Sequence, residues 1–199
     1  AGGEVRTRCR MVDLDTTDDA VRGVTLVTTD PDGTEREERV LTDCVILACG
    51  HSARDVFELL RDRNVTMERK TFAMGVRGAA PYSLSCHLPS GRSAFSFCMC
   101  PGGYVVSAAS EPGGVCTNGM SLSDRAGTNA NSGLLANVFP EDLPGDDVLA
   151  GVELQRSCER AAFAAGGGAY VAPAQLVGDF LQRAPSSAGG RVRPTYPRG

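Results

Sequence analysis

The sequence predicts a mixed α/β (α+β) fold, and three patterns carry that prediction. An unbroken apolar run at residues 44–49 passes through Gly50 into a stretch with helical periodicity, as a strand followed by a helix does. After residue 67, four short segments rich in β-branched and aromatic residues are separated by Gly and Pro turns, which indicates a β-rich part. A long amphipathic stretch then ends at a run of three glycines, residues 166–168, which is typical of a helix terminus.

Residues 1–66 are expected to form a small antiparallel meander, a buried strand and one helix. Residues 5–12 and 21–28 have strand-like composition, and Asp30-Pro31-Asp32-Gly33 supplies a turn after them. Residues 44–49 are apolar without alternation, the pattern of a strand buried on both faces of a parallel sheet. Ser52 is the predicted N-cap of the helix that follows, and Asn64 is its predicted stop.

Residues 67–185 are expected to form a β-rich domain with one long helix. The predicted strands are residues 71–77, 82–88, 93–99 and 104–110, whereas Asn118-Gly119 and residues 123–132 are predicted to be loops. The long helix is predicted from about Asp146 to Ala165, with Asp146 or Asp147 as its cap. Its predicted buried residues are Val148, Leu149, Val152, Cys158, Ala162 and Phe163. A short apolar element is predicted at residues 174–181, and residues 186–199 are predicted to be a linker or truncated tail.

Charge and hydropathy exclude several functional classes. The 24 acidic residues exceed the 20 basic ones, so a nucleic-acid-binding surface is not expected. No run approaches the roughly 20 apolar residues that a bilayer span needs, and no signal peptide is visible at the N-terminus. The first residue is Ala and the last stretch is unpatterned, which predicts a piece of a longer chain.

The eight cysteines are predicted to be reduced thiols. No two of them have the two-residue gap of a zinc knuckle, so no metal site is expected. The spacing of Cys44 and Cys49 equals that of the redox pair in flavin-linked disulfide reductases, but an odd offset on a strand sends the two thiols to opposite faces. The expected location is a reducing intracellular compartment, the cytoplasm or the plastid stroma.

Two turns are candidate ligand sites. In the first, Ala48-Cys49-Gly50 ends the predicted strand, and His51 and Ser52 open the helix, where free backbone N–H groups can meet a ligand. The alternative is an ordinary strand-to-helix turn in which Ser52 merely caps the helix.

The second candidate turn is Cys98-Met99-Cys100-Pro101-Gly102-Gly103, where a tight backbone could press against a planar ring system. The alternative is a hairpin with buried cysteines. Asn118-Gly119 adds further turn chemistry. With only His51 and His87 and no G-x-S-x-G elbow, the sequence supports no catalytic triad, and the catalytic residues stay unknown.

Several strings, read in order, resemble one family, the uncharacterised FAD-dependent dehydrogenases, which are NAD(P)/FAD-dependent oxidoreductases. These strings are residues 45–55, 72–77, 95–106, 117–121, 129–132 and 173–180, and the run Ser-Phe-Cys-Met-Cys-Pro-Gly-Gly is the most specific of them. The resemblance covers most of the chain.

The resemblance implies a partial FAD/NAD(P)-binding Rossmann-like domain at residues 1–66 and a β-rich inserted domain over the isoalloxazine at residues 67–185. Ala48-Cys49-Gly50 matches an Ala-Thr-Gly motif, with Cys in place of Thr. The implied FAD-binding residues are Ala48, Cys49, Gly50, His51, Ser52, Cys98, Cys100, Pro101, Gly102, Gly103, Asn118 and Gly119. The family's Gly-rich pyrophosphate loop is absent, and a stretch after residue 77 is shorter than expected.

The expected function is therefore that of a segment of an FAD-dependent oxidoreductase, which passes reducing equivalents through a non-covalently bound flavin to or from an unknown small molecule. NAD(P)H is a possible further cofactor, and no nucleic-acid partner is expected. One alternative is a truncated fold without cofactor that acts at most as an interaction module. Another is a thiol redox protein that uses Cys98 and Cys100, although one intervening residue makes a strained bridge.

Overall fold

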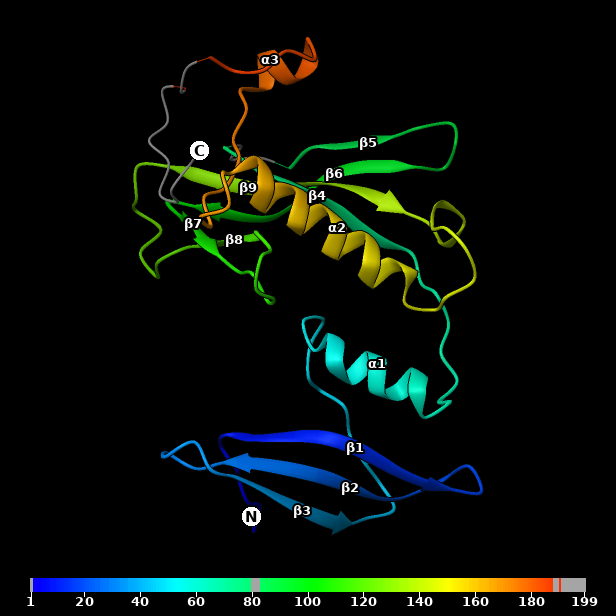
Figure 1. Ribbon diagram of the computed structural model, residues 1–199. Coiled ribbons are helices and arrows are strands. Elements are labelled where there is room, and N and C mark those ends of the chain that lie inside the picture. The colour runs from blue at the N-terminus through cyan, green and yellow to red at the C-terminus, as the bar shows by residue number, and fades with distance from the viewer. Residues whose placement is uncertain (1, 80–82, 188–189, 191–199) are drawn as a thin grey trace. The chain divides into compact units, whose positions relative to one another are not determined.

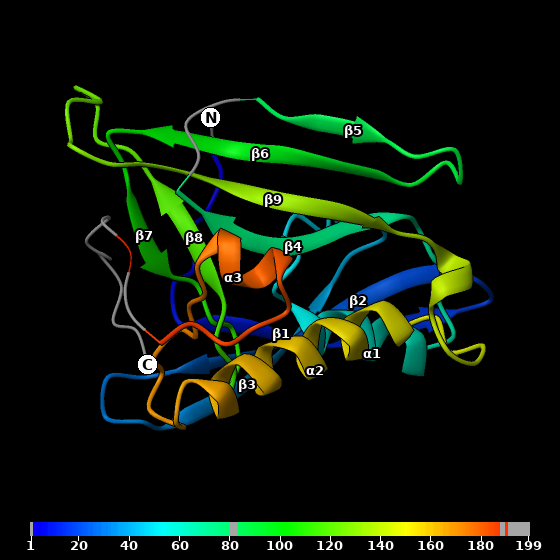
Figure 2. The same ribbon diagram turned by 90° about the horizontal axis from the view of Figure 1, so that it is seen from above.

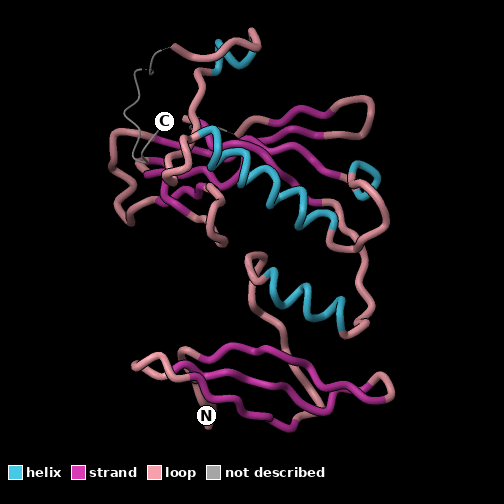
Figure 3. Tube along the Cα trace, in the orientation of Figure 1, coloured by secondary structure: helices cyan, strands magenta, loops and turns pink. Residues whose placement is uncertain are grey.

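The computed structural model describes residues 2–79, 83–187 and 190, and it divides the chain into two compact units, Ala1–Glu68 and Arg69–Gly199 (Figures 1 and 3). Both units combine helices with strands, so the predicted mixed α/β class is confirmed. Every strand pairing among the described residues is antiparallel.

The first unit is a three-stranded meander with one helix. Strands β1 (Cys9–Thr17), β2 (Ala20–Thr29) and β3 (Glu35–Leu41) pair in chain order, which confirms the predicted meander. Its first strand occupies residues 9–17 and not the predicted 5–12. Helix α1 (Arg54–Asp62) contributes two of the four residues of the core, which consists of Leu14, Val24, Val56 and Leu60. The charged strand β3 has almost fully exposed side chains, which is why the hydrophobic pattern did not reveal it.

The predicted buried strand at residues 44–49 is wrong for this chain. These residues have no regular secondary structure, and Ile46 is 87% exposed. An apolar strand of a parallel sheet is held by hydrogen bonds to neighbours on both sides, and within the described residues no strand pairs with this segment.

The predicted helix after Gly50 is confirmed, but its predicted cap is not. Helix α1 begins at Arg54, its N-cap is Ala53, and no side chain caps it. Instead, the Ser52 carbonyl accepts a hydrogen bond from the backbone N–H of Arg54 (2.9 Å). Asn64 follows the helix with φ of 55°, a conformation typical of the predicted stop.

The second unit contains two antiparallel sheets (Figure 2). The larger sheet has the order β4 (Phe72–Gly78), β9 (Ala130–Val138), β6 (Ser93–Pro101) and β5 (Ser85–His87). The smaller one pairs β7 (Tyr104–Ser107) with β8 (Thr117–Met120). The four strands predicted here exist, whereas the loops predicted at Asn118-Gly119 and around residues 130–132 are wrong. Cross-strand partners, and not local propensity, place both stretches in β8 and β9.

Helix α2 (Ala150–Ala165) is the predicted long helix, and it begins at Ala150 and not near Asp146. Asp147 stabilises the turn that precedes α2, because its Oδ1 accepts a hydrogen bond from the Leu149 N–H (2.9 Å). The glycine stop is confirmed: Gly166 is the C-cap, and a Cβ there would overlap the Val171 carbonyl. The predicted burial of Cys158 is wrong, since that thiol is exposed.

Two short helices complete the second unit. The 3₁₀ helix η1 (Pro140–Asp142) follows β9, and the exposed helix α3 (Val177–Leu181) lies in the predicted apolar element. All eight cysteines are free thiols. Among the described residues, no helix has the length and apolar character needed to cross a bilayer, and no group of three or more His, Cys, Asp and Glu side chains would hold a metal ion. Most of the tail predicted at residues 186–199 lies outside the described residues.

Candidate functional site

A bulge in strand β6 sets the geometry of the candidate site. The pairing of β6 with β9 shifts register between Phe97 and Cys100, and Cys98 takes φ of 50°, which is uncommon for a residue other than glycine. The side chain of Cys98 is exposed, whereas Cys100 is buried. The bulge therefore separates the two predicted site cysteines, and the Cys100 thiol donates back to the Cys98 carbonyl (3.3 Å).

The turn after β6 is closely packed against the neighbouring backbone. Gly102 has φ of 63°, and a Cβ there would overlap the Arg125 carbonyl. At Gly103 a Cβ would overlap the Met120 carbonyl and lie 2.8 Å from the Cβ of Cys100. Both glycines are required by this packing, and the Pro101 carbonyl accepts a hydrogen bond from the Ser121 hydroxyl (3.1 Å).

Arg77 at the end of β4 reaches across to this bulge. Its Nη1 donates to the Asn131 side-chain oxygen (2.5 Å) and the Cys98 carbonyl (3.2 Å), and lies 3.9 Å from the Cys100 sulfur. The side chain is half-buried. We call Arg77, Cys98, Cys100 and Asn131 the Arg77 cluster; its members come from β4, β6 and β9.

Gly119 of β8 closes the Arg77 cluster from the smaller sheet. A Cβ at this position would overlap Arg77 Nη1 and lie 2.5 Å from Asn131 Oδ1, so the guanidinium packs directly on the Gly119 backbone. The exposed Asn118 is oriented locally, because its Oδ1 accepts a hydrogen bond from the Gly119 N–H (2.8 Å). The second candidate turn and Asn118-Gly119, far apart in sequence, thus meet at one place.

Two buried polar groups beside the Arg77 cluster have no hydrogen-bond partner among the described residues. They are Nδ2 of Asn131, a residue only 4% exposed, and Oγ of Ser132, which is fully buried. An unsatisfied buried donor costs roughly 1–3 kcal/mol, and such groups in native proteins are found at ligand or water sites. Each unsatisfied group is able to donate a hydrogen bond.

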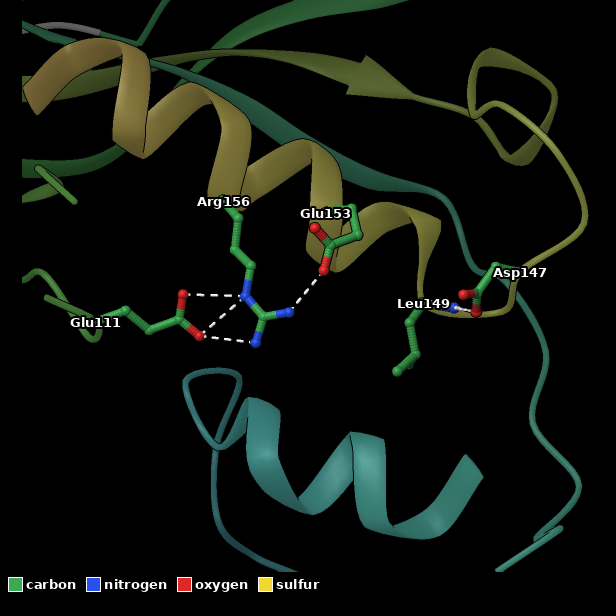
Figure 4. Close-up of polar contacts among 5 residues, drawn as sticks. All are labelled: Glu111, Asp147, Leu149, Glu153 and Arg156. Carbon is green, nitrogen blue, oxygen red and sulfur yellow. Dashed lines mark hydrogen bonds and ion pairs between the residues drawn. The ribbon is translucent and has the colours of Figure 1, made fainter. Parts of the chain in front are cut away.

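An ion pair secures the connection that leads into β8. Figure 4 shows Arg156 of α2 held in a fork by Glu111, with Nε 3.0 Å from both carboxylate oxygens and Nη2 2.8 Å from one of them. Glu153 accepts a further hydrogen bond from Nη1 (2.6 Å). The Val115 N–H also donates to the Glu159 carbonyl of α2 (3.0 Å). Helix α2 therefore fixes the segment that presents Gly119 to Arg77.

The other predicted site residues, at positions 48–52, lie in the first unit, and all of them are exposed. Gly50 has φ of 74° and open space where a Cβ would stand. Ser52 Oγ lies 3.4 Å from His51 Nε2, and these two residues form a turn before α1. The strand expected to present this turn is absent, so the geometry that predicted a ligand site here is not formed in the described residues.

A cavity of about 480 Å³ in the first unit is lined by Val12, Thr25, Leu59 and Glu37 together with three ion-paired residues, Asp13, Asp62 and Arg63. Asp13 and Arg63 form a two-pronged ion pair there, with Arg63 Nε 2.6 Å from Asp13 Oδ1. The arginine lowers the pKa of the Asp13 carboxyl. This pair ties the end of α1 to β1, which is a structural role.

Comparison with known proteins places this chain. A family model described as FAD-dependent protein, C-terminal domain-like, matches residues 66–199. The chain belongs to this family. It is also 43% identical over 185 residues to an uncharacterized protein of Clostridium beijerinckii (strain ATCC 51743 / NCIMB 8052). The match covers 81% of this chain but 35% of that protein, so the chain spans about a third of the relative's length.

The family match includes the whole Arg77 cluster. Asn131 Nδ2 is the donor within the cluster that remains for a carbonyl oxygen of a ligand. Ser132 is the next residue of β9, so its side chain faces the other side of the sheet. The sequence has no G-x-G-x-x-G loop for the pyrophosphate.

Sequence reasoning missed Arg77, Asn131 and Ser132 as site residues. A signal for Arg77 exists: it is the one charged residue of the apolar strand β4, whose sequence is FAMGVRG. Asn131 and Ser132 lie in one of the strings that resemble the family, residues 129–132. Their composition nevertheless predicts a loop, and only pairing on both sides of β9 places them in a strand.

Proposed function

We propose that this chain is part of an FAD-dependent oxidoreductase that transfers reducing equivalents through a non-covalently bound flavin to or from a small molecule. Membership of the FAD-dependent family supports the flavin. The observation that carries the proposal is the Arg77 cluster, where the buried donor Asn131 Nδ2 has no acceptor among the described residues.

In this proposal the second unit lies over the isoalloxazine ring. The turn Pro101-Gly102-Gly103 would lie beside the ring, with Pro101 as its exposed member, and the side chain of Asn131 would donate to one of the ring's carbonyl oxygens. The exposed Cys98 thiol would stand at the edge of the site. Bound FAD would supply the redox chemistry, while these residues position it and exclude water.

We propose further that residues 48–52 contact the dinucleotide once residues 44–49 are paired in a Rossmann-like sheet built with other parts of a longer polypeptide. The matched relative is long enough to contain such parts, because the alignment covers 35% of it. The proposal includes NAD(P)H as electron donor, although no residue of the Arg77 cluster is assigned to bind it.

The visible absorption spectrum tests the proposal. The 199-residue chain, mixed with FAD and freed of unbound FAD by gel filtration, should retain little or none, because its sequence lacks the pyrophosphate loop. A longer polypeptide that includes the flanking sequence should be yellow when purified under the same conditions.

Two controls make the result decisive. In the longer polypeptide, Asn131→Leu should reduce flavin content, whereas Gly178→Ala, at a position with open space around it, should leave it unchanged. A colourless longer polypeptide that takes up no added FAD would overturn the oxidoreductase proposal and favour a fold without cofactor.

A further inference from the structure

Arg77 has no acidic partner among the described residues, unlike the two ion-paired arginines Arg92 and Arg156 of the second unit. Arg92 pairs with Asp142 (2.8 Å) and Arg156 pairs with Glu111 (2.8 Å). All hydrogen bonds of Arg77 are made by Nη1 and go to neutral acceptors, so within the described residues Nε and Nη2 bind nothing. A half-buried guanidinium without a counter-charge is costly unless an anion joins it.

The neighbouring groups are also suited to an anion. Asn131 Nδ2 is a buried donor without a partner, and its oxygen already fixes Arg77. The guanidinium cannot retreat toward the smaller sheet, because the Gly119 backbone lies directly against Nη1. Arg77 therefore offers a planar fork of two donors, Nε and Nη2, which matches the geometry of a carboxylate.

An exposed aromatic ring lies on the same face of the sheet. Arg77 of β4 is paired with Gly133 of β9, and Gly133 is paired with Phe97 of β6. Directly paired residues point to the same face, so Arg77 and Phe97 stand two strand spacings apart, roughly 10 Å. Gly133 between them has no side chain, and Phe97 is 61% exposed.

We infer that this row, Arg77, Gly133 and Phe97, is a binding site for a carboxylate that carries an apolar or aromatic body. The carboxylate would be held by Arg77, with one of the two Asn131 Nδ2 hydrogens as a further donor and the other left for the flavin oxygen. The apolar body would cross Gly133 to Phe97. A pyrophosphate fits less well, because it carries more charge than the one cation of the cluster balances. The carboxylate site is inferred independently of the proposed oxidoreductase. Only the identification of this ligand as the enzyme's substrate rests on that proposed function.

Titration of the ¹⁵N-labelled 199-residue chain, without flavin, tests the site. The probes are acetate, phenylacetate, inorganic phosphate and pyrophosphate at low ionic strength, and the signals followed are the Arg77 Nε–H and the Asn131 side-chain amide. Phenylacetate should produce saturable shifts of both, with a lower Kd than acetate. Because no flavin is present, the outcome is separate from that of the FAD experiment.

Variants assign the binding to named residues. Arg77→Lys, which keeps the charge but not the fork, should raise the phenylacetate Kd about tenfold or more. The matched control Arg160→Gln removes an exposed positive charge on α2 and should keep the Kd within about twofold. Phe97→Ala should abolish the preference for phenylacetate over acetate. Because the Phe97 ring is exposed, its removal should not prevent folding.

Three results would overturn the inference. One is the absence of saturable shifts with both carboxylates in the wild-type chain, which is independent of any variant's folding. Another is equal binding by Arg77→Lys and the wild type. The third is tighter Arg77-dependent binding of phosphate or pyrophosphate than of phenylacetate, which would assign the site to a phosphate group.

Discussion

At the scale of single residues, the candidate site depends on positions where a side chain would not fit. Glycine within a strand usually weakens it, yet Gly119 occupies β8 because the Arg77 guanidinium takes the space of a Cβ. Gly102 and Gly103 admit neighbouring backbone in the same way. These glycines were predicted as site residues from a turn and a resemblance, whereas their steric reason is tertiary.

We expect Gly119→Ala to destabilise the protein by about 1–3 kcal/mol, the usual range for overpacking. The added methyl group would displace Arg77 and break its contact with Asn131. Urea unfolding measures the change, and the matched control is Gly178→Ala in α3, which has open space at the Cβ position. The control should be neutral or stabilising; equal destabilisation of both variants would contradict the steric explanation.

At the scale of elements, a charged tie joins the strand hairpin β5–β6 to the turn after β9. Arg92 donates to both oxygens of Asp142 (2.8 and 2.9 Å), and its Nη1 also donates to the Asn137 carbonyl (2.7 Å). Asp142 Oδ2 accepts a further hydrogen bond from the Phe139 N–H (2.8 Å). The hydrogen bond from Arg92, followed by that from Phe139, lowers the pKa of Asp142 to about 2.

This tie makes part of the stability depend on pH. Since the pKa is depressed in the folded state, the ionised Asp142 stabilises the fold above its unfolded pKa of about 3.9, and that contribution is lost as the pH falls toward 2. Asp142→Asn should therefore lower Tm at pH 7, and the difference from wild type should shrink between about pH 4 and pH 2. The neighbouring Glu141→Gln is the control; a Tm difference for Asp142→Asn that stays constant down to pH 2 would refute the assignment.

Elements also differ in how far sequence patterns reveal them. The meander of β1 and β2, the helices α1 and α2 and the strands β4 to β7 follow from local periodicity and turn residues. Strand β3 is charged, β8 contains Asn-Gly, and β9 begins with Ala-Asn-Ser, so none of them has a local strand signal. Pairing with a neighbour decides these three.

At the scale of the whole molecule, residues 44–49 show a disagreement between sequence and structure that pairing within the described residues does not resolve. Their apolar pattern demands burial, yet Ile46 and Leu47 are 87% and 46% exposed. A strand of this type needs partners on both sides, and the chain spans 35% of its longer relative. We therefore interpret the segment as one whose pairing partners belong to other parts of a longer polypeptide.

Hydrogen exchange checks this interpretation. In the 199-residue chain the backbone amides of residues 44–49 should exchange rapidly, because no strand is paired with them among the described residues. In a polypeptide that includes the flanking sequence, they should be protected. The amides of β2 are the internal reference, since both sides of β2 are paired in the isolated chain. Equally fast exchange of residues 44–49 in both proteins would contradict the interpretation.

The sequence by itself determined the mixed α/β class, most of the helices and strands, and the resemblance to an FAD-dependent family. These features follow from the spacing and composition of residues that lie close together in the sequence. Only the tertiary structure brings Arg77, Asn131 and Gly119 together and aligns Arg77 with Phe97. It also leaves the buried donors of Asn131 and Ser132 without hydrogen-bond partners among the described residues. Such contacts depend on which strands pair and in which register. That pairing joins residues more than fifty positions apart, such as Arg77 and Asn131, so local sequence patterns do not reveal it.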